Sequence, residues 1–470
     1  MCMQGVAQCV CPNISESGNM TVTVQTVTEL KNALDLANSN NGNMTIKLDP
    51  GIYTLDSNLR FISDNMANLT IMGSSGVKED VTIKGLGWNN NAVTHIFNVA
   101  ADHFTLAHMT IGEVYYHPIQ VHSNPNDADD FKVQNVKFID AKEQLLKVSG
   151  GGSLYADRGQ VLCCEFEFTA GIAYQYYTGG IDAHRAVNWI VENNIFKHIR
   201  SPESNLAEHA IHFWRGSQGT IVNANQIIDC DRGIGFGLGP DISSGHTGGM
   251  IVNNFIHTSR DVGIGLESAP DASVYNNTVV TENYSNSIEY RFPSTTNVEI
   301  INNLVNGSII DRSSGSSGNA ITNVTVTSLD LFVDASNYDY HISGSPSDII
   351  DAGTNLNIID TDYDCEERIL GLGIDIGADE TDISSDTDII LAEDCIELYP
   401  NPTSGIFSIK GLLENYAIRV IDYNGVVHKM YHQPSGLIEI DLSNLPVGLY
   451  FVRIEHKLST HVAIQTILKF

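Results

Sequence analysis

Three ionisable side chains, Lys147, Asp182 and His212, each occupy the second position of a short segment that alternates apolar and polar residues. An amine, a carboxylate and an imidazole within reach of one another can supply the base, acid and counter-charge of a proton-transfer reaction. The three residues lie 35 and 30 positions apart. They can therefore act together only in a fold that places distant segments side by side.

Seven segments of this kind recur along the chain. Their first and third residues are apolar and fill a core, so we expect their second and fourth residues to face solvent from a single sheet. The segments are Ile119–His122, Leu146–Ser149, Ile181–His184, Ile211–Trp214, Ile234–Gly237, Ile264–Glu267 and Ile288–Arg291.

The outward positions define two columns of side chains. The second-position column runs Gln120, Lys147, Asp182, His212, Gly235, Gly265 and Glu289, and the fourth-position column runs His122, Ser149, His184, Trp214, Gly237, Glu267 and Arg291. Neighbouring strands lie about 4.8 Å apart, so Lys147, Asp182 and His212 should form one contiguous ladder. The acidic neighbour would orient the His212 imidazole.

The same face has the composition of a ligand-binding groove. Histidine and tryptophan side chains would form its wall, glycines would leave room for a ligand, and residues next to the strands would build its rim. The candidate binding residues are Gln120, His122, His117, Trp214, Gly235, Gly265, His209 and Arg215.

An asparagine-rich phrase repeats between the segments. The second asparagine of each phrase falls at positions 194, 225, 254, 277 and 303, separated by 31, 29, 23 and 26 residues. A period of 20 to 50 residues with strands and no interleaved helices is typical of stacked β coils. We expect these asparagines to point inward and form a ladder from coil to coil.

The repeated coils resemble the right-handed parallel β-helix superfamily that includes pectate, alginate and chondroitin lyases. The phrase Tyr338 to Glu380 resembles the closing segment that follows such helices in exported bacterial proteins. The phrase LYPNPTSG from Leu398, followed by VIDYNGVV and DLSNLPVGLYFVRI, resembles the C-terminal sorting domain of the type IX secretion system. This last resemblance implies export.

The expected fold is all-β, with a right-handed parallel β-helix solenoid followed by a small Ig-like β-sandwich. Residues 1–26 are unassigned, residues 27–323 form the β-helix with a capping helix over 27–38, and residues 324–381 close it. Residues 382–394 form an acidic linker, and residues 395–470 form the sorting sandwich.

Three functions fit this face. A polysaccharide lyase acting on a uronate glycan would use Lys147 or His212 as base, with His184 beside them and with Arg185, Arg215 or an ion held by Asp182 to neutralise the substrate carboxylate. An inverting glycoside hydrolase would use Glu267 and Glu289, about 8 Å apart on adjacent coils next to Arg291. A non-catalytic adhesin would bind glycan through residues such as Trp214.

The expected cofactor, if one is needed, is a divalent cation such as calcium. A transition metal held by His184, His212 and Asp182 is the alternative, although their spacing matches no known metal motif. The eight cysteines do not form a recognisable framework, but Cys365 and Cys395 could pair.

Charge and hydropathy exclude several classes of partner. The chain carries 56 acidic and 25 basic side chains, a formal charge of -31, which would repel nucleic acid and anionic lipid. It contains no apolar stretch long enough to span a membrane, and its first residues lack the features of a secretory signal. We expect a secreted or surface-located protein whose partners are a polysaccharide and the type IX secretion machinery.

Overall fold

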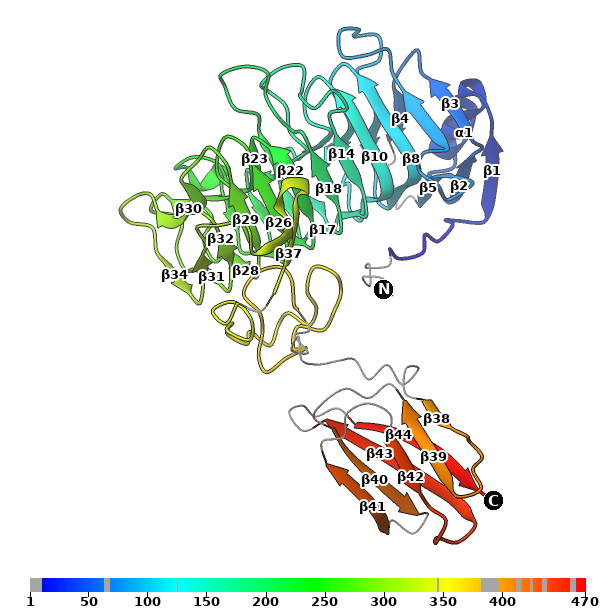
Figure 1. Cartoon of the computed structure of the whole chain (residues 1–470). Coiled ribbons are helices and arrows are strands. Elements are labelled where there is room, and N and C mark those ends of the chain that lie inside the picture. Colours follow the sequence, from blue (N-terminus) through cyan, green and yellow to red (C-terminus); the bar gives the residue numbers. More distant parts are fainter. Residues whose placement is uncertain are drawn as a thin grey trace. The chain divides into compact units, whose positions relative to one another are not determined.

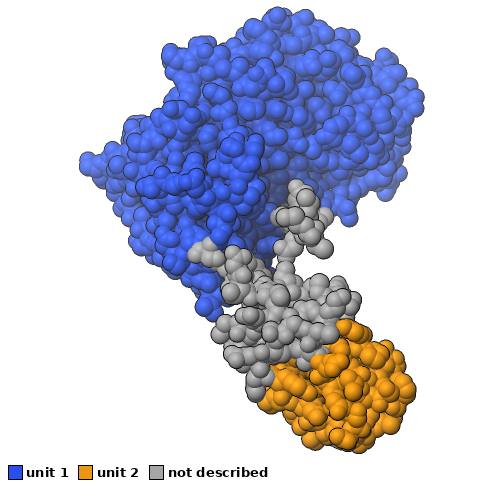
Figure 2. All heavy atoms as spheres, viewed as in Figure 1, with its two compact units in different colours: residues 1–382 blue, residues 383–470 orange. Residues whose placement is uncertain are grey.

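Coils of the chain stack in parallel, one strand width apart, in a computed structural model of the protein (Figure 1). The structure describes residues 11–62, 68–124, 126–344, 346–381, 397–410, 416–422, 426–432, 438–456 and 462–470. These residues belong to two compact units, 1–382 and 383–470 (Figure 2). Each unit has its own hydrophobic core. The predicted fold class is confirmed.

One ten-stranded parallel sheet contains all seven segments identified from the sequence. Its strands are β4 (Leu59–Ile62), β7 (His95–Ala100), β9 (His117–His122), β11 (Leu146–Ser149), β15 (Ile181–His184), β19 (His209–Trp214), β23 (Arg232–Phe236), β27 (Ile264–Glu267), β30 (Asn286–Arg291) and β33 (Ser308–Asp311).

Two further columns of parallel strands complete the coils, and the long strands β8 (Phe104–Val114) and β10 (Lys132–Ala141) run through both. The first column also contains β1 (Met20–Val24), β2 (Met44–Leu48), β5 (Leu69–Gly73), β13 (Gln160–Leu162), β17 (Ile190–Glu192), β21 (Ile221–Asn223), β25 (Met250–Val252), β28 (Ser273–Tyr275), β31 (Val298–Ile301) and β34 (Gly318–Ile321). The second also contains β3 (Gly51–Thr54), β6 (Val81–Lys84), β14 (Glu165–Glu167), β18 (Ile195–Lys197), β22 (Gln226–Cys230), β26 (Phe255–Thr258), β29 (Thr278–Thr281), β32 (Leu304–Val305) and β35 (Val324–Thr325). A short sheet at the coil corners contains β12 (Ala156–Asp157), β16 (Ala186–Val187), β20 (Ser217–Gln218) and β24 (His246–Thr247).

Helix α1 (Val27–Ser39) lies at the first coil, as the apolar spacing of the sequence indicates. Thr26 caps its N-terminus, and the Glu29 carboxylate accepts hydrogen bonds from the Thr26 and Gln25 amides, which makes a capping box. The helix buries Leu30 and Leu34 in the solenoid core. It therefore shields the apolar end that the first coil would otherwise expose.

The predicted asparagine ladder is present and fully buried. The Asn254 amide donates to Asn277 Oδ1 at 2.8 Å and accepts from Asn225 Nδ2 at 3.0 Å. The same bonds repeat from Asn194 to Asn225 and from Asn277 through Asn303 to Asn323. Each amide also donates to a main-chain carbonyl of the preceding coil, such as Val222 for Asn254. The ladder thus satisfies main-chain groups at a turn inside the core.

The first asparagine of each phrase has a different role. Asn253, Asn276 and Asn302 adopt positive φ, which asparagine tolerates better than most residues. Their side-chain amides donate to the carbonyls of Thr361, Asp375 and Thr354, respectively. These bonds attach the segment after the last coil to the side of the solenoid. That segment also includes the 3₁₀ turn η2 (Ala335–Asn337) and the antiparallel pair β36 (Phe332–Asp334) and β37 (Asp339–Ile342).

A disulfide joins Cys11 to Cys163 and so ties the segment before β1 to the solenoid. Its neighbour Cys164, in the turn between β13 and β14, is free and buried in the core. Cys365 is disulfide-bonded as well. Its expected partner Cys395 and the predicted linker 382–394 lie outside the described residues.

The second unit contains two antiparallel sheets that share one core. One contains β38 (Glu397–Tyr399), β39 (Ile406–Lys410) and β42 (Ile438–Asp441). The other contains β40 (Tyr416–Asp422), β41 (Val427–His432), β43 (Gly448–His456) and β44 (Val462–Lys469). This arrangement is the small sandwich that the sequence predicts.

Asn254→Ala should lower the unfolding free energy of the solenoid by at least about 3 kcal/mol, because the substitution leaves several buried donors and acceptors unpaired. Urea unfolding followed by circular dichroism measures the change. Asn319→Ala is the matched control, since Asn319 is exposed on β34. Equal unfolding midpoints for the two variants would contradict a stabilising role for the ladder.

Candidate active site

The register of the ten-stranded sheet is the one expected from the sequence. Lys147 pairs with Gln120 on one side and with Asp182 on the other, and Asp182 pairs with His212. The column continues through Gly235 and Gly265 to Glu289. The alignment of the seven segments is therefore confirmed.

The expectation that both columns face solvent is wrong for the second-position column. Asp182 is 3% exposed, His212 is 1% exposed and Lys147 is 8% exposed. Gln120 and Glu289 are buried too. Longer side chains of the fourth-position column lie across them, as Trp214 does when its Nε1 donates to Asp182 Oδ1 at 2.7 Å. Since buried charges need partners, this column forms a bonded network instead of an open row.

Asp182 is the centre of that network. Its Oδ2 accepts a hydrogen bond from Lys147 Nζ, and its Oδ1 lies 3.4 Å from His184 Nε2. Burial alone would raise the pKa of Asp182, but the hydrogen bond with His184 and the charge of Lys147 together hold it well below its usual value. Asp182 therefore stays ionised and fixes the side chains around it.

The His184 side chain is 13% exposed, slightly more than the 10% of Lys147 and the 4% of Asp182. Its Nε2 lies 3.2 Å from Lys147 Nζ, and its ring packs edge-on against Trp214. Burial lowers the pKa of His184, and the Asp182 carboxylate offsets only part of that effect. A neutral imidazole whose Nε2–H faces the Asp182 carboxylate can accept a proton at its other ring nitrogen, Nδ1.

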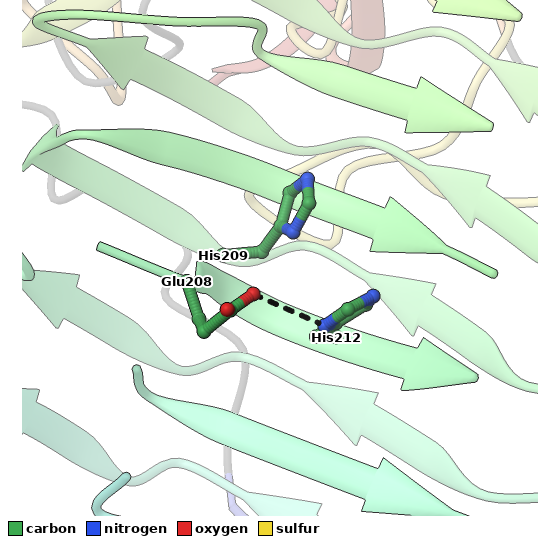
Figure 3. A group of neighbouring side chains, drawn as sticks. All are labelled: Glu208, His209 and His212. Atoms are coloured by element: carbon green, nitrogen blue, oxygen red, sulfur yellow. Dashed lines mark ion pairs between the residues drawn. The ribbon is translucent and has the colours of Figure 1, made fainter. Parts of the chain in front are cut away.

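His212 does not bond to Asp182, contrary to the prediction. Its Nε2 lies 3.1 Å from the Gly237 carbonyl, and its Nδ1 lies 3.8 Å from Glu208 Oε2. Figure 3 shows the Glu208 carboxylate directed at the His212 ring, with the His209 imidazole next to them. Because His212 stacks beneath Trp214 and is almost fully buried, it cannot reach a polymer substrate as a base.

The two glycines of the column have different surroundings. A Cβ at Gly235 would lie 2.8 Å from three ring atoms of His209, so that imidazole occupies the space predicted for a ligand. Gly265 lines a pocket of about 180 Å³ together with His209. Burial lowers the pKa of His209 well below its usual value.

The same pocket contains both carboxylates of the hydrolase hypothesis, Glu267 and Glu289. Glu267 Oε1 accepts a hydrogen bond from Arg291 Nε at 3.0 Å, and Glu289 Oε1 accepts one from Arg312 Nη1 at 2.5 Å. An inverting hydrolase needs one protonated carboxyl and one carboxylate that activates water. Pairing of each carboxylate with an arginine does not suit either role.

Three of the remaining predicted residues lie on β9, and Arg215 directly follows β19. His117 Nδ1 donates to the Gln144 carbonyl at 2.8 Å, Gln120 Nε2 donates to Ser149 Oγ at 2.9 Å, and His122 Nε2 lies 3.4 Å from Asn98 Oδ1. Arg215 is exposed, with its guanidinium 5.5 Å from the centre of the Trp214 ring.

Sequence reasoning missed Tyr177 and Arg312. Tyr177 lies in the loop that leads into β15, and burial together with the charges of Asp182 and Glu143 raises the pKa of its phenol. The pair Tyr176-Tyr177 just before the Asp182 strand was the available signal. Arg312 follows β33, whose sequence Ser-Ile-Ile-Asp does not show the alternation of the other segments.

Two described groups of three side chains could hold a metal ion: Glu208 with His209 and His212, and His341 with Asp364 and Asp379. His341 bonds to carboxylates through both ring nitrogens, and its pKa is raised to about 10 because Asp364, Asp379 and Asp339 outweigh the effect of burial. A protonated imidazole cannot ligate. Both groups contain imidazole, whereas calcium prefers oxygen ligands alone.

Residues 397–469 match the family described as a secretion system C-terminal sorting domain. No curated protein matches the chain. The identification of a type IX sorting domain is confirmed, and the protein is secreted or located at the cell surface. None of the described helices is long and apolar enough to cross a membrane.

Solved structures with a similar architecture include pectate lyase Pel9A, with 11% identity and a TM-score of 0.40 over 77% of this chain and 97% of that one. The A-module of Azotobacter vinelandii mannuronan C-5 epimerase AlgE6 has 10% identity and a TM-score of 0.40 over 64% and 95%. A polygalacturonase from Erwinia carotovora has 12% identity and a TM-score of 0.39 over 69% and 100%. Identities this low do not indicate an activity.

Buried histidines should make the solenoid sensitive to acid. Burial lowers the pKa of His117 to about 3, so between pH 6.5 and 3 the folded chain holds fewer protons at this site than the unfolded chain does. Stability is therefore lost as pH falls through that window, by about 1.4 kcal/mol per pH unit for a fully shifted group.

Urea unfolding at pH 7, 5.5 and 4.5 tests this effect. His117→Gln should reduce the loss of stability between pH 7 and 4.5, while His103→Gln, at a partly exposed position before β8, should leave it unchanged. An identical pH dependence in wild type and His117→Gln would show that His117 does not carry the effect.

Proposed function

We propose that the protein is a secreted polysaccharide lyase that cleaves a uronate-containing glycan on the outward face around His184. The observation that carries the proposal is the partly buried His184 imidazole, held in the network of Lys147 and Asp182. Extraction of the proton α to a uronate carboxylate requires a neutral base that has a fixed orientation.

In the proposed reaction His184 accepts the C5 proton of the uronate. The electron pair of the C–H bond forms the C4–C5 double bond, and the C4–O4 bond to the neighbouring sugar breaks. Tyr177 donates its phenolic proton to the leaving oxygen. Its raised pKa keeps that proton on the phenol at neutral pH, and the proton that His184 has taken returns to the site through solvent.

Negative charge develops on the uronate carboxylate when the C5 proton leaves, so a nearby cation lowers the barrier. Arg215 is exposed on the loop that follows β19, over the Trp214 ring. Arg185 follows β15 directly after His184, with its guanidinium 4.4 Å from the centre of the Tyr155 ring. These two arginines and the Trp214 face provide charge and an apolar surface for one sugar unit.

Lys147 is assigned a positioning role instead of the base role expected from the sequence. Its ammonium group bonds to the Asp182 carboxylate and contacts His184. Asp182, buried and ionised, in turn holds Trp214. Removal of either member should therefore misplace His184 without removing the base itself.

The full-length protein incubated with a panel of uronate polysaccharides should produce the ultraviolet absorbance of unsaturated uronates. His184→Gln should lower kcat at least about 100-fold, the usual contribution of a general base. His198→Gln is the matched control, because His198 lies beyond β18 on a different face. The acid limb of kcat/KM should lie below pH 6.5, since His184 must be neutral and its pKa is lowered.

Two results would contradict the proposal. Absorbance that persists in His184→Gln would exclude His184 as the base. New reducing ends without absorbance, lost in Glu267→Gln, would assign hydrolysis to the carboxylates of the adjacent pocket.

A further inference from the structure

We infer that Glu208, His209 and His212 form a binding site for a divalent transition metal ion, with Zn²⁺ as the best match. The site does not depend on the proposed lyase reaction, because none of its ligands is assigned a role in that reaction. The inference rests on the tautomer of His212, on unpaired atoms of its neighbours and on the space made for the His209 ring.

The ligand atoms converge from a single stretch of chain. Glu208 directly precedes β19, and His209 and His212 lie on that strand. One carboxylate oxygen and one ring nitrogen from each histidine all lie within 4.8 Å of one another (Figure 3). A strand fixes its side chains more firmly than a loop does, which favours a preformed site.

The His212 tautomer points a lone pair at Glu208. Its Nε2 lies 3.1 Å from the carbonyl of Gly237, which can only accept a hydrogen bond, so this nitrogen carries the proton. In the neutral ring Nδ1 is then an acceptor, and it faces Glu208 Oε2 at 3.8 Å. Two hydrogen-bond acceptors that face each other repel, and a cation between them would remove this repulsion. A backbone carbonyl on the far ring nitrogen is also the usual way in which a metal-binding histidine is oriented.

His209 provides a second, independent observation. It is 6% exposed, and its Nδ1 has no hydrogen-bond partner among the residues that the structure describes. Glu208 Oε2 has none within the same residues. Buried polar atoms without partners are rare and need a physical reason. A metal ion between them would satisfy these groups together.

The coils next to β19 are built to accept the His209 ring. A Cβ at Gly235 would clash with three of its ring atoms, and the next position in register is Gly265. Glycine at position 235 therefore allows the imidazole to lie over β23, whereas a Cβ at Gly265 would only make an ordinary contact with the ring. The ring also lines the pocket of about 180 Å³. The Glu208 side chain is 28% exposed, which gives an ion a path to the group from solvent.

The donor set selects the class of metal. Two imidazoles and one carboxylate suit zinc and related transition metals, whereas calcium and magnesium prefer oxygen ligands. Ligand atoms around tetrahedral zinc lie about 3.3 Å apart, so the 3.8 Å between His212 Nδ1 and Glu208 Oε2 needs to close by about half an ångström.

Isothermal titration calorimetry of the untagged, full-length, chelator-treated protein tests the inference, with ZnCl₂ as the titrant. We expect a zinc site that 1 mM CaCl₂ does not compete for. Glu208→Gln keeps the size of the side chain at a partly exposed position, and it should weaken this site at least about tenfold. His122→Gln, a histidine of the same sheet outside the group, should bind zinc like wild type.

Visible absorption of bound Co²⁺ reports metal ligation directly, so it distinguishes ligands from residues that only stabilise the fold. Bound Co²⁺ should show visible absorption bands of a nitrogen- and oxygen-ligated site, and His209→Asn should abolish them while circular dichroism confirms that the variant is folded. Absence of zinc binding in wild type, or unchanged zinc affinity in both Glu208→Gln and His209→Asn, would overturn the inference. A wild-type protein that binds zinc but shows no lyase activity would contradict only the proposed function.

Discussion

In-register stacking of the coils is the constraint on which the rest of this structure depends. In the coils from Asn194 to Asn303, the turn asparagine must lie at the same height, because its amide bonds to the asparagine of the next coil and to a carbonyl of the preceding coil. This requirement fixes the register of the three columns of strands in these coils. Once the register is fixed, residues far apart in the sequence become neighbours about 4.8 Å apart on the outer face.

Stacking of the coils also buries ionisable side chains in one column, which is electrostatically unfavourable unless they are paired. Lys147, Asp182 and His212 are held in one buried column, where isolated charges would be strongly unfavourable. Lys147 and Asp182 compensate each other, and Asp182 engages Trp214 as well as the ring of His184. The consequence is a rigid polar layer beneath the surface, with His184 and the arginines above it. The further carboxylates, Glu267 and Glu289, are compensated by arginines in the same way.

Much of the fold could be predicted because its signals are local and periodic. Alternation within the seven segments gave the strands, and the spacing of the asparagines gave the ladder that continues to Asn323. The resemblance of the motifs after Leu398 to those of the type IX sorting domain predicted the second unit. The neighbours of Lys147 and Asp182 followed from the register alone.

Burial and side-chain direction could not be predicted in the same way. Alternation shows which side of a strand a residue faces, but not what covers it, so the second-position column was expected in solvent. The Gly235 and Gly265 column looked like space for a ligand, because the sequence does not show that the His209 ring crosses onto it. Arg312 pairs with Glu289 from a strand that lacks the repeated pattern. Such contacts depend on three-dimensional packing between coils and not on the pattern within one coil.

Transfer of the C5 proton to His184 is the central claim, and hydrogen exchange at that carbon tests it most directly. A uronate oligosaccharide incubated with the protein in D₂O and followed by NMR reports proton removal whether or not the chain is then cleaved. The account predicts loss of the C5 proton signal with wild type and its retention with His184→Gln. Cleavage of the glycan without any involvement of the C5 proton would contradict it.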